Sequence, residues 1–384
     1  TSHSSTAPAT GSNRQLPFRW QICFCVNMMA EMTAMGFSTT AKAPAVLVTG
    51  IAGNLGRTLA PLLKDRLLVG VDLVCPSLDH PCTQFCQLDL SQPDAPAVLA
   101  QLIHENDIRV VIHLAFVLDP VRTGAVDEQR QWQINVHGTR HVLEAIKETN
   151  REKLQVELLI FLSSVTAYGS NLPEPVREDA PLNGHTFSYA VHKRETDLLC
   201  QESHPRLGGC AVYILRAHIF LGKAMDNFIL RALRGQPSGR GWLAEWVRRL
   251  GWRLPLILPR GRRYDGLFQF VHIEDVARLL RWLCSHYVRG RLEILNLQGK
   301  GKPLTTLDCA VIADARLFRL PSYRLVAFLF RLLWWIGLSG VPPQALPYFT
   351  GSYPMNCARL IALLGNDFDQ IIRNTSQESL RDTV

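Results

Sequence analysis

Short apolar runs alternate with amphipathic stretches along the chain from residue 45 onward. Continuously apolar strands that alternate with helices are typical of a parallel sheet covered on both faces. The pattern therefore predicts an α/β fold, a doubly wound parallel sheet. The predicted strands are 45–49, 67–73, 83–90, 109–115 and 156–164, and the predicted helices are 54–64, 93–106 and 126–149.

The alternation becomes irregular after about residue 221, where stretches rich in glycine and arginine begin. We expect residues 43–384 to form one unit, with 43–220 making most of the sheet. Residues 221–384 would make most of a smaller C-terminal lobe with interleaved elements. Residues 1–42, rich in Ser, Thr, Ala and Met, are expected to be disordered or a misassigned extension.

The composition is that of a globular protein, with 384 residues, 47% hydrophobic and 19% charged. The net charge is +8, but the basic residues gather at 248–263 and do not run along the whole chain. Arginines near tryptophans suit nucleic acid, yet nothing else here does, so no nucleic-acid partner is predicted. Most cysteines lie in apolar runs, which indicates a reducing compartment, the cytoplasm.

Two apolar segments raise the question of a membrane. No run of about 20 uncharged apolar residues occurs, so no transmembrane helix is predicted. The segment 325–338 is interrupted by Arg331, and a core or interface helix is favoured over a membrane-surface helix. The segment 242–263 carries three tryptophans and several arginines. A mobile substrate lid or a solvated helix is favoured there over a membrane patch.

One group of residues could suggest a metal. Cys75, His80, Cys82 and Cys86 fall within twelve residues. The usual C-x-x-C pairing of zinc sites is missing, and Cys86 lies in a predicted strand. Isolated thiols and a loop histidine are the favoured interpretation, so no metal is predicted.

Three glycines at three-residue spacing follow the first apolar strand, in VLVTGIAGNLG (46–56). In a dinucleotide-binding turn, Gly50 permits the sharp bend, Gly53 lets the backbone approach a pyrophosphate, and Gly56 lets the helix pack on the strand. The helix that follows would present free N–H groups to the phosphates.

An acidic residue stands where such a turn requires one. Asp72 ends the next strand, 22 residues after Gly50. A carboxylate there binds both ribose hydroxyls and repels a 2′-phosphate, which favours NAD over NADP. The alternative is an ordinary strand-end carboxylate.

A second set of residues suits proton transfer. Tyr189 and Lys193 are four apart in a predicted helix, so their side chains share a face. A neighbouring ammonium would lower the tyrosine pKa and make the phenol an acid or base near neutrality. Ser164, at the end of the fifth strand, could hydrogen-bond a substrate oxygen.

These motifs together resemble the extended branch of the short-chain dehydrogenase/reductase superfamily, the NAD-dependent epimerase/dehydratase family, over roughly residues 44–365. TGIAGNLG (49–56) is similar to the family's TGxxGxxG, SSVTAYG (163–169) to its SSxxxYG, and VHIEDVA (271–277) to a late structural segment. The resemblance implies a Rossmann-type sheet with a substrate-binding C-terminal lobe, bound NAD, and often a homodimer. It assigns catalysis to Ser164, Tyr189, Lys193 and Asn135, the last in NVHGT (135–139). The cofactor-binding residues it implies, with the turn and strand ends, are Gly50, Gly53, Asn54, Leu55, Gly56, Asp72, Asp89, Leu90, Leu114, Ala115, Tyr189, Lys193 and His218.

Two positions depart from the family's sugar-nucleotide enzymes. Ile219 stands where those enzymes carry an asparagine, and Phe268 where they carry an arginine that pairs with the substrate diphosphate. Nearby Arg262 and Arg263 could bind a diphosphate from another direction. His218 either faces the nicotinamide or is a satisfied buried histidine, which is the favoured interpretation.

Three functions remain open. The first is an NAD-dependent oxidoreductase acting on a hydroxyl or ketone of a relatively apolar small molecule. The second is a nucleotide-sugar epimerase; a dehydratase is disfavoured because Val165 and Thr166, not an Asp-Glu pair, follow Ser164. The third is a dinucleotide-sensing protein without catalysis, and the presence of Ser164, Tyr189 and Lys193 argues against it.

Overall fold

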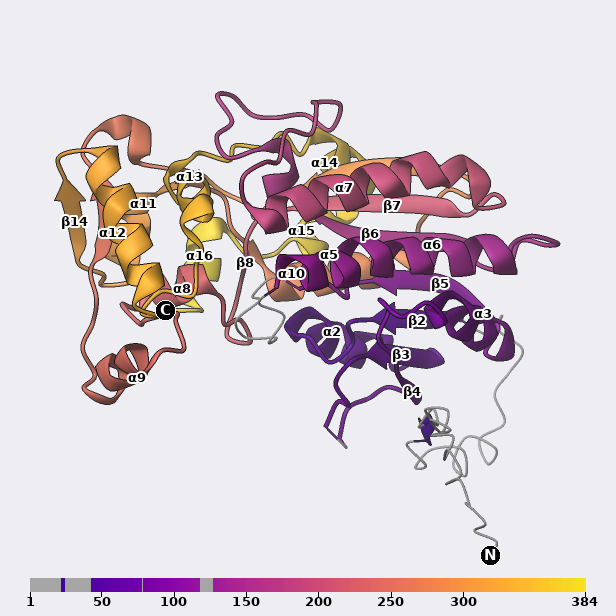
Figure 1. Ribbon diagram of the computed structural model, residues 1–384. Helices are drawn as coiled ribbons and strands as arrows, with labels where there is room; N and C mark the ends of the chain where they lie inside the picture. Colours follow the sequence, from indigo (N-terminus) through magenta and orange to yellow (C-terminus); the bar gives the residue numbers. More distant parts are fainter. Residues whose placement is uncertain (1–21, 25–42, 78, 118–126) are drawn as a thin grey trace, which may run out of the picture.

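The computed structural model describes residues 22–24, 43–77, 79–117 and 127–384 (Figure 1). An eight-stranded sheet forms its centre. Seven strands are parallel, and the edge strand β1 pairs antiparallel with β4. The predicted parallel sheet is confirmed, with this edge strand added. In spatial order the strands are β1 (Ile22–Phe24), β4 (Gln84–Gln87), β3 (Leu68–Asp72), β2 (Ala45–Thr49), β5 (Ile108–His113), β6 (Leu158–Ser164), β7 (Ala211–Ala217) and β12 (Leu292–Leu297).

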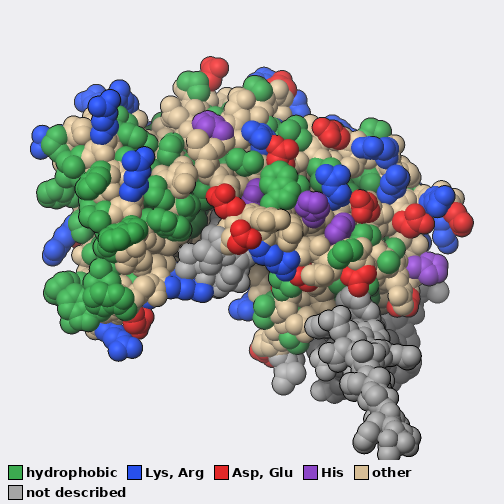
Figure 2. All heavy atoms as spheres, viewed as in Figure 1, with side chains coloured by type: hydrophobic (Ala, Val, Ile, Leu, Met, Phe, Trp, Pro, Cys, Tyr) green, Lys and Arg blue, Asp and Glu red, His purple; other side chains and the backbone are tan. Residues whose placement is uncertain are grey.

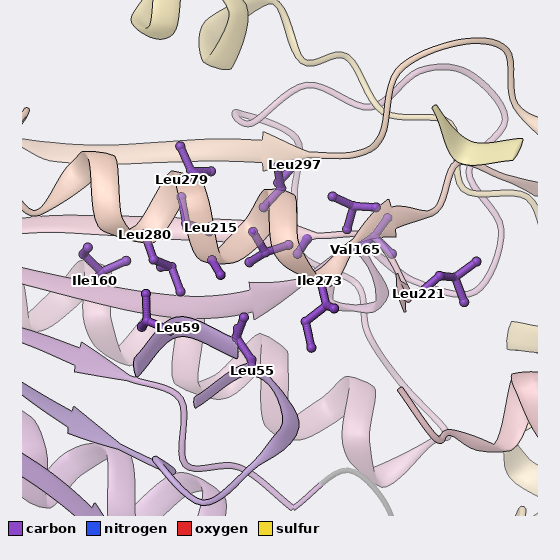
Figure 3. Close-up of a cluster of buried hydrophobic side chains, with 14 of the residues drawn as sticks. Leu55, Leu59, Ile160, Val165, Leu215, Leu221, Ile273, Leu279, Leu280 and Leu297 are labelled. Carbon is purple, nitrogen blue, oxygen red and sulfur yellow. The ribbon is translucent and has the colours of Figure 1, made fainter. Parts of the chain in front are cut away.

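Both faces of the sheet are buried because successive strand residues point to opposite sides. In β2, Val46 and Val48 join one apolar cluster and Leu47 joins the other. Figure 3 shows Leu55 and Leu59 of α2 and Leu279 and Leu280 of α10 on the first face. The first face is covered by α2 (Asn54–Leu59) and α10 (Ile273–Leu283), and the second by α3 (Ala95–Glu105), α6 (Gly138–Thr149) and α7 (Ser188–Ser203).

The predicted helix 126–149 is helical from Glu128 to Thr149, but it contains a π-helical turn. Its residue 126 lies outside the described ranges, and α5 (Glu128–Trp132) begins after Asp127, whose carboxylate accepts from the Gln129 and Arg130 N–H groups. Residues Gln133–His137 form a π-helical turn before α6 starts. Such single turns occur frequently at functional sites. The hydrophobic period alone gives no sign of it.

A smaller lobe lies at the carboxyl end of the sheet (Figure 1). It combines short strand pairs with helices. Its strands are β8 (Phe220–Leu221), β9 (Leu256–Pro259), β10 (Leu267–Phe268), β11 (Val271–His272), β13 (Leu304–Thr305) and β14 (Leu317–Leu320), and its helices are α8 (Phe228–Leu233), α9 (Trp242–Arg249), α11 (Thr306–Ile312), α12 (Tyr323–Trp335), α13 (Leu346–Thr350) and α16 (Ser376–Arg381). The chain returns to the sheet with α10 and β12, and α14 (Ala358–Leu364) and α15 (Phe368–Ile371) pack there.

The N-terminal segment and the possibility of a membrane-spanning helix are also subjects of prediction. Within 1–42, Ile22–Phe24 form β1, unlike the expected disorder, and the rest of that range lies outside the described residues. Among the helices that the structure describes, none is both long enough and apolar enough to cross a membrane.

Candidate active site

The glycine-rich turn lies against the end of β5. Gly50 has φ +74°, and a Cβ atom there would lie 2.6 Å from the Ala115 backbone nitrogen. Leu114 donates its N–H to the Thr49 carbonyl, 3.1 Å away. The structure therefore brings together Gly50, Leu114 and Ala115, three of the residues predicted to bind the cofactor. Only glycine fits at position 50, for both conformation and space.

The start of α2 suits an anionic ligand. A Cβ atom on Gly56 would lie 2.4 Å from the Ile51 carbonyl oxygen, so the helix packs directly on the turn. No side chain caps the helix at Gly53, which leaves first-turn N–H groups for a phosphate. Asn54 is half-buried near Met225, and Leu55 is buried in the core. Leu55 thus supports the turn from below.

Asp72 is tied to this turn. Its carboxylate accepts hydrogen bonds from the Ala52 N–H at 2.9 Å and from the Val74 N–H at 3.2 Å. The acid therefore sits at the tip of β3 beside the glycine turn, where a ribose would lie. The residues present fit a dinucleotide with free ribose hydroxyls.

Asp89 and Leu90 anchor the loop after β4. Arg130 of α5 pairs with Asp89 and donates to the Ser91 hydroxyl at 2.7 Å. Burial opposes ionisation of Asp89, but hydrogen bonds from Ser91 and Arg130 outweigh it and lower its pKa. The Leu90 carbonyl accepts from His141 Nδ1 at 2.7 Å. Both predicted residues therefore hold this loop to α5 and α6.

Ser164, Tyr189 and Lys193 converge at the ends of β6 and α7. Ser164 ends β6, and its hydroxyl accepts from the Thr166 N–H at 3.2 Å and from the Thr166 hydroxyl at 3.0 Å. Tyr189 lies near Ser164, whose hydroxyl acts to lower the pKa of the tyrosine. Lys193 Nζ donates to the Leu162 carbonyl at 2.6 Å and lies 3.5 Å from the centroid of the Phe116 ring. Phe116, which the sequence analysis did not single out, therefore also belongs to the site.

The pKa values at this site differ from the prediction. Burial raises the pKa of Tyr189 to about 12, although hydrogen bonding with Ser164 opposes the shift. Burial lowers the pKa of Lys193 to about 7, although Asp197 and Cys200 oppose it. Burial disfavours the charged form of Lys193. Lys193 therefore does not lower the pKa of Tyr189, contrary to what the four-residue spacing alone suggests. The phenol is protonated at neutral pH.

Asn135 lies in the π-helical turn and joins three segments. Its amide accepts from the Val117 N–H at 2.7 Å and donates to the Val117 carbonyl at 3.1 Å. It also reaches His192 Nδ1 on α7 at 3.1 Å. Asn135 thus fixes the loop after β5 against the helix that carries Tyr189 and Lys193, which is a positioning contact.

A chain of hydrogen bonds supports Asn135. The Thr139 hydroxyl donates to the Asn135 carbonyl at 2.6 Å and lies 3.0 Å from His113 Nε2. Thr49 bonds His113 Nδ1 at 2.6 Å and accepts from the Ala115 N–H at 3.3 Å. Because Thr139 already donates, His113 carries its proton on Nε2. Burial lowers the His113 pKa to about 3, so the chain holds a neutral ring.

A buried ion pair fixes α7 on the sheet, and no local motif of the sequence indicates it. Arg216 at the end of β7 donates to Asp197 at 2.9 and 3.0 Å and to the Tyr168 hydroxyl at 2.8 Å. Ser163 donates to the same carboxylate at 2.6 Å. Burial opposes the charge on Arg216, but Asp197 outweighs it and raises the arginine pKa. Ser163 precedes Ser164, so this network sets the position of the strand end that carries Ser164.

His218 lies at the border with the lobe. Its ring nitrogens face the Ile219 and Gln269 N–H groups at 2.8 and 3.2 Å. The rings of Phe268, Phe270 and Tyr353 surround it edge-on. Burial lowers its pKa to about 3. A neutral imidazole accepts at only one ring nitrogen, so only one of these two contacts is a hydrogen bond. Within the described residues the contacts of His218 are with these neighbours and none is with Ser164, Tyr189 or Lys193, which favours a buried core histidine over cofactor binding.

The candidate zinc residues do not form a metal centre. In the described ranges no group of three or more His, Cys, Asp or Glu side chains lies close enough to hold a metal ion. Cys75 is exposed, whereas Cys82 and Cys86 are buried. Every cysteine for which the structure gives a state, eight in all, is a free thiol.

An apolar cavity of about 180 Å³ occupies the lobe. No charged side chain lines it in the described part of the chain. Phe268 lines its wall, and Thr306 Oγ1 is a buried lining oxygen that lacks a hydrogen-bond partner among the described residues. Other lining residues include Phe228, Leu256, Phe270, Leu329, Phe330 and Phe349.

Aromatic rings connect Tyr189 to this cavity; Tyr189, Ser164 and Lys193 are called the candidate triad below. Tyr189 contacts Phe187 with ring centroids 5.9 Å apart, and Phe187 contacts Tyr348 at 5.6 Å. Tyr348 is followed by Phe349, which lines the cavity and contacts Phe330 at 6.0 Å. Ser164, Tyr189 and Lys193 are not themselves lining residues. Phe187 and Tyr348 therefore lie between the candidate triad and the cavity.

Comparison with known families gives a clear result. Residues 46–297 match the model of the NAD dependent epimerase/dehydratase family. The chain belongs to this family. The membership confirms the resemblance drawn from TGIAGNLG and SSVTAYG, and the Rossmann-type fold with it.

Curated relatives within the family include dehydrogenases and epimerases. D-erythronate dehydrogenase of Cupriavidus necator is 34% identical over 171 residues, which cover 41% of this chain and 49% of that protein. UDP-glucose 4-epimerase of Bacillus subtilis is 29% identical over 273 residues, 66% of this chain and 75% of that protein. The first match therefore spans about half of its relative's length.

Solved structures show the same fold at low identity. MoeE5 in complex with UDP-glucuronic acid and NAD has a TM-score of 0.62 at 21% identity and covers 88% of this chain and 97% of that one. Bordetella bronchiseptica WbmH in complex with NAD+ has a TM-score of 0.62 at 18% identity, with the same coverage. The epimerase/dehydratase architecture thus extends over most of this chain.

Proposed function

We propose that this chain is an NAD-dependent oxidoreductase acting on a hydroxyl or ketone of a relatively apolar small molecule. The main support is the lobe cavity, which no charged side chain lines among the described residues. Phe268 in its wall stands where the sugar-nucleotide enzymes carry an arginine. An apolar wall cannot supply the charge-assisted bonds, each about 1.5–3 kcal/mol, that a diphosphate needs. Family membership and the glycine turn with Asp72 support NAD.

The cavity also indicates something about the substrate. Thr306 Oγ1 is the buried lining oxygen without a partner in the described structure. A buried hydroxyl without a partner is costly, and a bound oxygen would satisfy it. We infer that the substrate carries a second oxygen, remote from the reacting one, that bonds Thr306.

Ser164 and Tyr189 would handle the proton. NAD, when bound, accepts or returns a hydride at the carbon that bears the oxygen. Tyr189 donates its phenolic proton to that oxygen on ketone reduction and takes it back on alcohol oxidation. Ser164 orients the oxygen by a hydrogen bond. The raised Tyr189 pKa keeps the phenol protonated at neutral pH, the form that ketone reduction requires.

A nucleotide-sugar epimerase is the second candidate, because several relatives carry that name. The same residues would serve it, with the hydride returned to the substrate. Ile219 and Phe268 oppose this reading, since both replace polar groups with apolar ones.

Cofactor retention and substrate class test the proposal. Full-length protein should bind NAD reversibly, more tightly than NADP, and turn over members of a panel of hydroxylated or ketonic polycyclic and long-chain compounds. Tyr189→Phe should lower kcat about 10²–10⁴-fold. Tyr287→Phe, whose hydroxyl bonds Glu157 elsewhere, is the matched control. Tightly retained NAD with turnover of UDP-sugars and none of the panel would refute the oxidoreductase proposal.

Two further predictions accompany this function. A reducing compartment, the cytoplasm, is supported by the free thiols of the described cysteines. A homodimer through α6 and α7 is the arrangement that the family resemblance implies. Sedimentation analysis of the purified protein would test it.

A further inference from the structure

The lobe carries two helices with apolar residues on their outward faces. On α9, Trp242, Trp246 and Leu250 recur every four residues and are 80%, 47% and 45% exposed. On α12 the exposed set is Leu325, Phe328, Leu332 and Trp335, at spacings of three and four. Such spacing places each set on one side of its helix. We call these seven residues the apolar face.

The apolar face is one surface. Gly241 donates its N–H to the Gly337 carbonyl at 3.2 Å, which joins the start of α9 to the end of α12. The most exposed tryptophans, Trp242 and Trp335 at 80% and 83%, flank this junction. Ala244, Val247 and Leu338 form a small buried cluster beneath it. Figure 2 shows hydrophobic side chains gathered at this end of the molecule, with blue basic ones beside them.

The charge around the apolar face has one sign. Segments 240–263 and 316–335 contain eleven arginines and one carboxylate, Glu245. Seven of these arginines are exposed and form no ion pair with described residues: Arg240, Arg260, Arg262, Arg263, Arg316, Arg324 and Arg331. Arg324 and Arg331 directly precede Leu325 and Leu332, so they lie along one edge of the apolar face on α12.

We propose that the apolar face docks the lobe on the surface of an anionic phospholipid bilayer. Exposed tryptophans and leucines on amphipathic helices insert at the headgroup boundary. Unpaired arginines around them attract anionic lipids. A protein partner would need a complementary acidic surface with an apolar centre, whereas an anionic leaflet offers both over any area.

The inner side of α12 lines the lobe cavity, which suggests a use for docking on a bilayer. Val326, Leu329, Phe330 and Leu333 on that side line the lobe cavity. One helix thus separates the cavity from the bilayer, and an apolar substrate would pass from lipid to cavity without crossing water. This use rests on the proposed function, but docking itself does not.

Vesicle co-sedimentation of the full-length protein tests docking without any substrate. Phosphatidylcholine vesicles should bind it weakly, and vesicles that also contain phosphatidylserine about tenfold more strongly, with the difference reduced by salt. The double variant Trp242→Ser/Trp335→Ser should lose binding about tenfold or more. Val288→Ser, an exposed apolar residue on the sheet domain, is its control. Arg324→Gln/Arg331→Gln should weaken only anionic vesicle binding, with Arg151→Gln/Arg206→Gln as control.

Each other outcome overturns the proposal. Absent binding, binding that the tryptophan variants do not change, or equal binding to neutral vesicles would do so. A dimer that Trp335→Ser dissociates, with no vesicle binding, would show that a second copy covers this face. NAD binding reports folding of every variant, so a failure of docking and a failure of the oxidoreductase proposal are read separately.

Discussion

The sheet domain and the lobe treat polar groups in opposite ways. Around the sheet ends, buried polar groups are paired in long-range networks: Arg216 with Asp197, and Thr49 through His113 to Thr139. In the lobe, the cavity has no charged lining residue among the described ones, and arginines stand unpaired outside. The difference teaches that the sheet domain fixes its buried polar groups by directed hydrogen bonds, whereas the lobe keeps its charges at the surface and an uncharged wall around its cavity.

The largest loss of stability is expected when one partner of the buried ion pair between Arg216 and Asp197 is removed. Asp197→Ala leaves Arg216 charged and unpaired, so the free energy of unfolding should fall by about 3–5 kcal/mol. Urea denaturation measures it. In the lobe, Glu245→Ala removes an exposed, solvent-screened partner of Arg248 and Arg249, so the loss of stability should be far smaller. Equal losses would contradict the contrast.

A charged side chain placed in the wall of the lobe cavity should remove its preference for apolar substrates. Phe268→Arg puts a guanidinium among Phe270 and Tyr353, so kcat/KM for apolar substrates should fall about 100-fold. Phe268→Leu should cost less than about tenfold. Steady-state kinetics with unchanged NAD affinity is the measurement. An unaffected Phe268→Arg enzyme would place the substrate elsewhere.

A smaller effect is expected at the ribose end of the site. Asp72→Ala removes the carboxylate beside Ala52 and should weaken NAD about tenfold while NADP changes little. Titration calorimetry with both nucleotides tests this. Asp107→Ala, an exposed carboxylate away from the turn, should leave both affinities as they were.

A single histidine should give the smallest change. The His218 pKa is about 3 in the folded protein and about 6.5 unfolded, so the unfolded chain takes up the proton first as the pH falls. The contribution is complete above pH 6.5 and is lost on acidification towards pH 3. From pH 7.5 to 5.5 the wild type should lose about 1.4 kcal/mol more than His218→Gln. Urea denaturation of both proteins at pH 7.5 and pH 5.5 checks it.

Local motifs made much of this site predictable. The turn from Gly50 to Gly56 and the acid at Asp72 follow from one strand-turn-helix unit, whose geometry is set by short-range sterics. The Tyr189–Lys193 pair follows from helical spacing. The pKa shifts did not follow, because they depend on how deeply neighbouring segments such as Phe116 bury the two groups.

Features assembled from distant segments escaped prediction. His113 meets Thr49 and Thr139 across 64 and 26 residues, and no single segment signals that contact. The lobe cavity draws on residues 228–349, which show no regular period. The apolar face was visible only as tryptophans and leucines, and its exposure depends on how α9 and α12 pack at Gly241 and Gly337.

α12 has a practical consequence for anyone who handles this protein. Its inner side is needed for the cavity and its outer side meets water, so no rotation of the helix would hide both. In lipid-free buffer the lobe should therefore limit the usable concentration, even when the sheet domain is fully stable. A mild detergent or short-chain lipid disc should raise that limit, and yields measured without one would underestimate how well the chain folds.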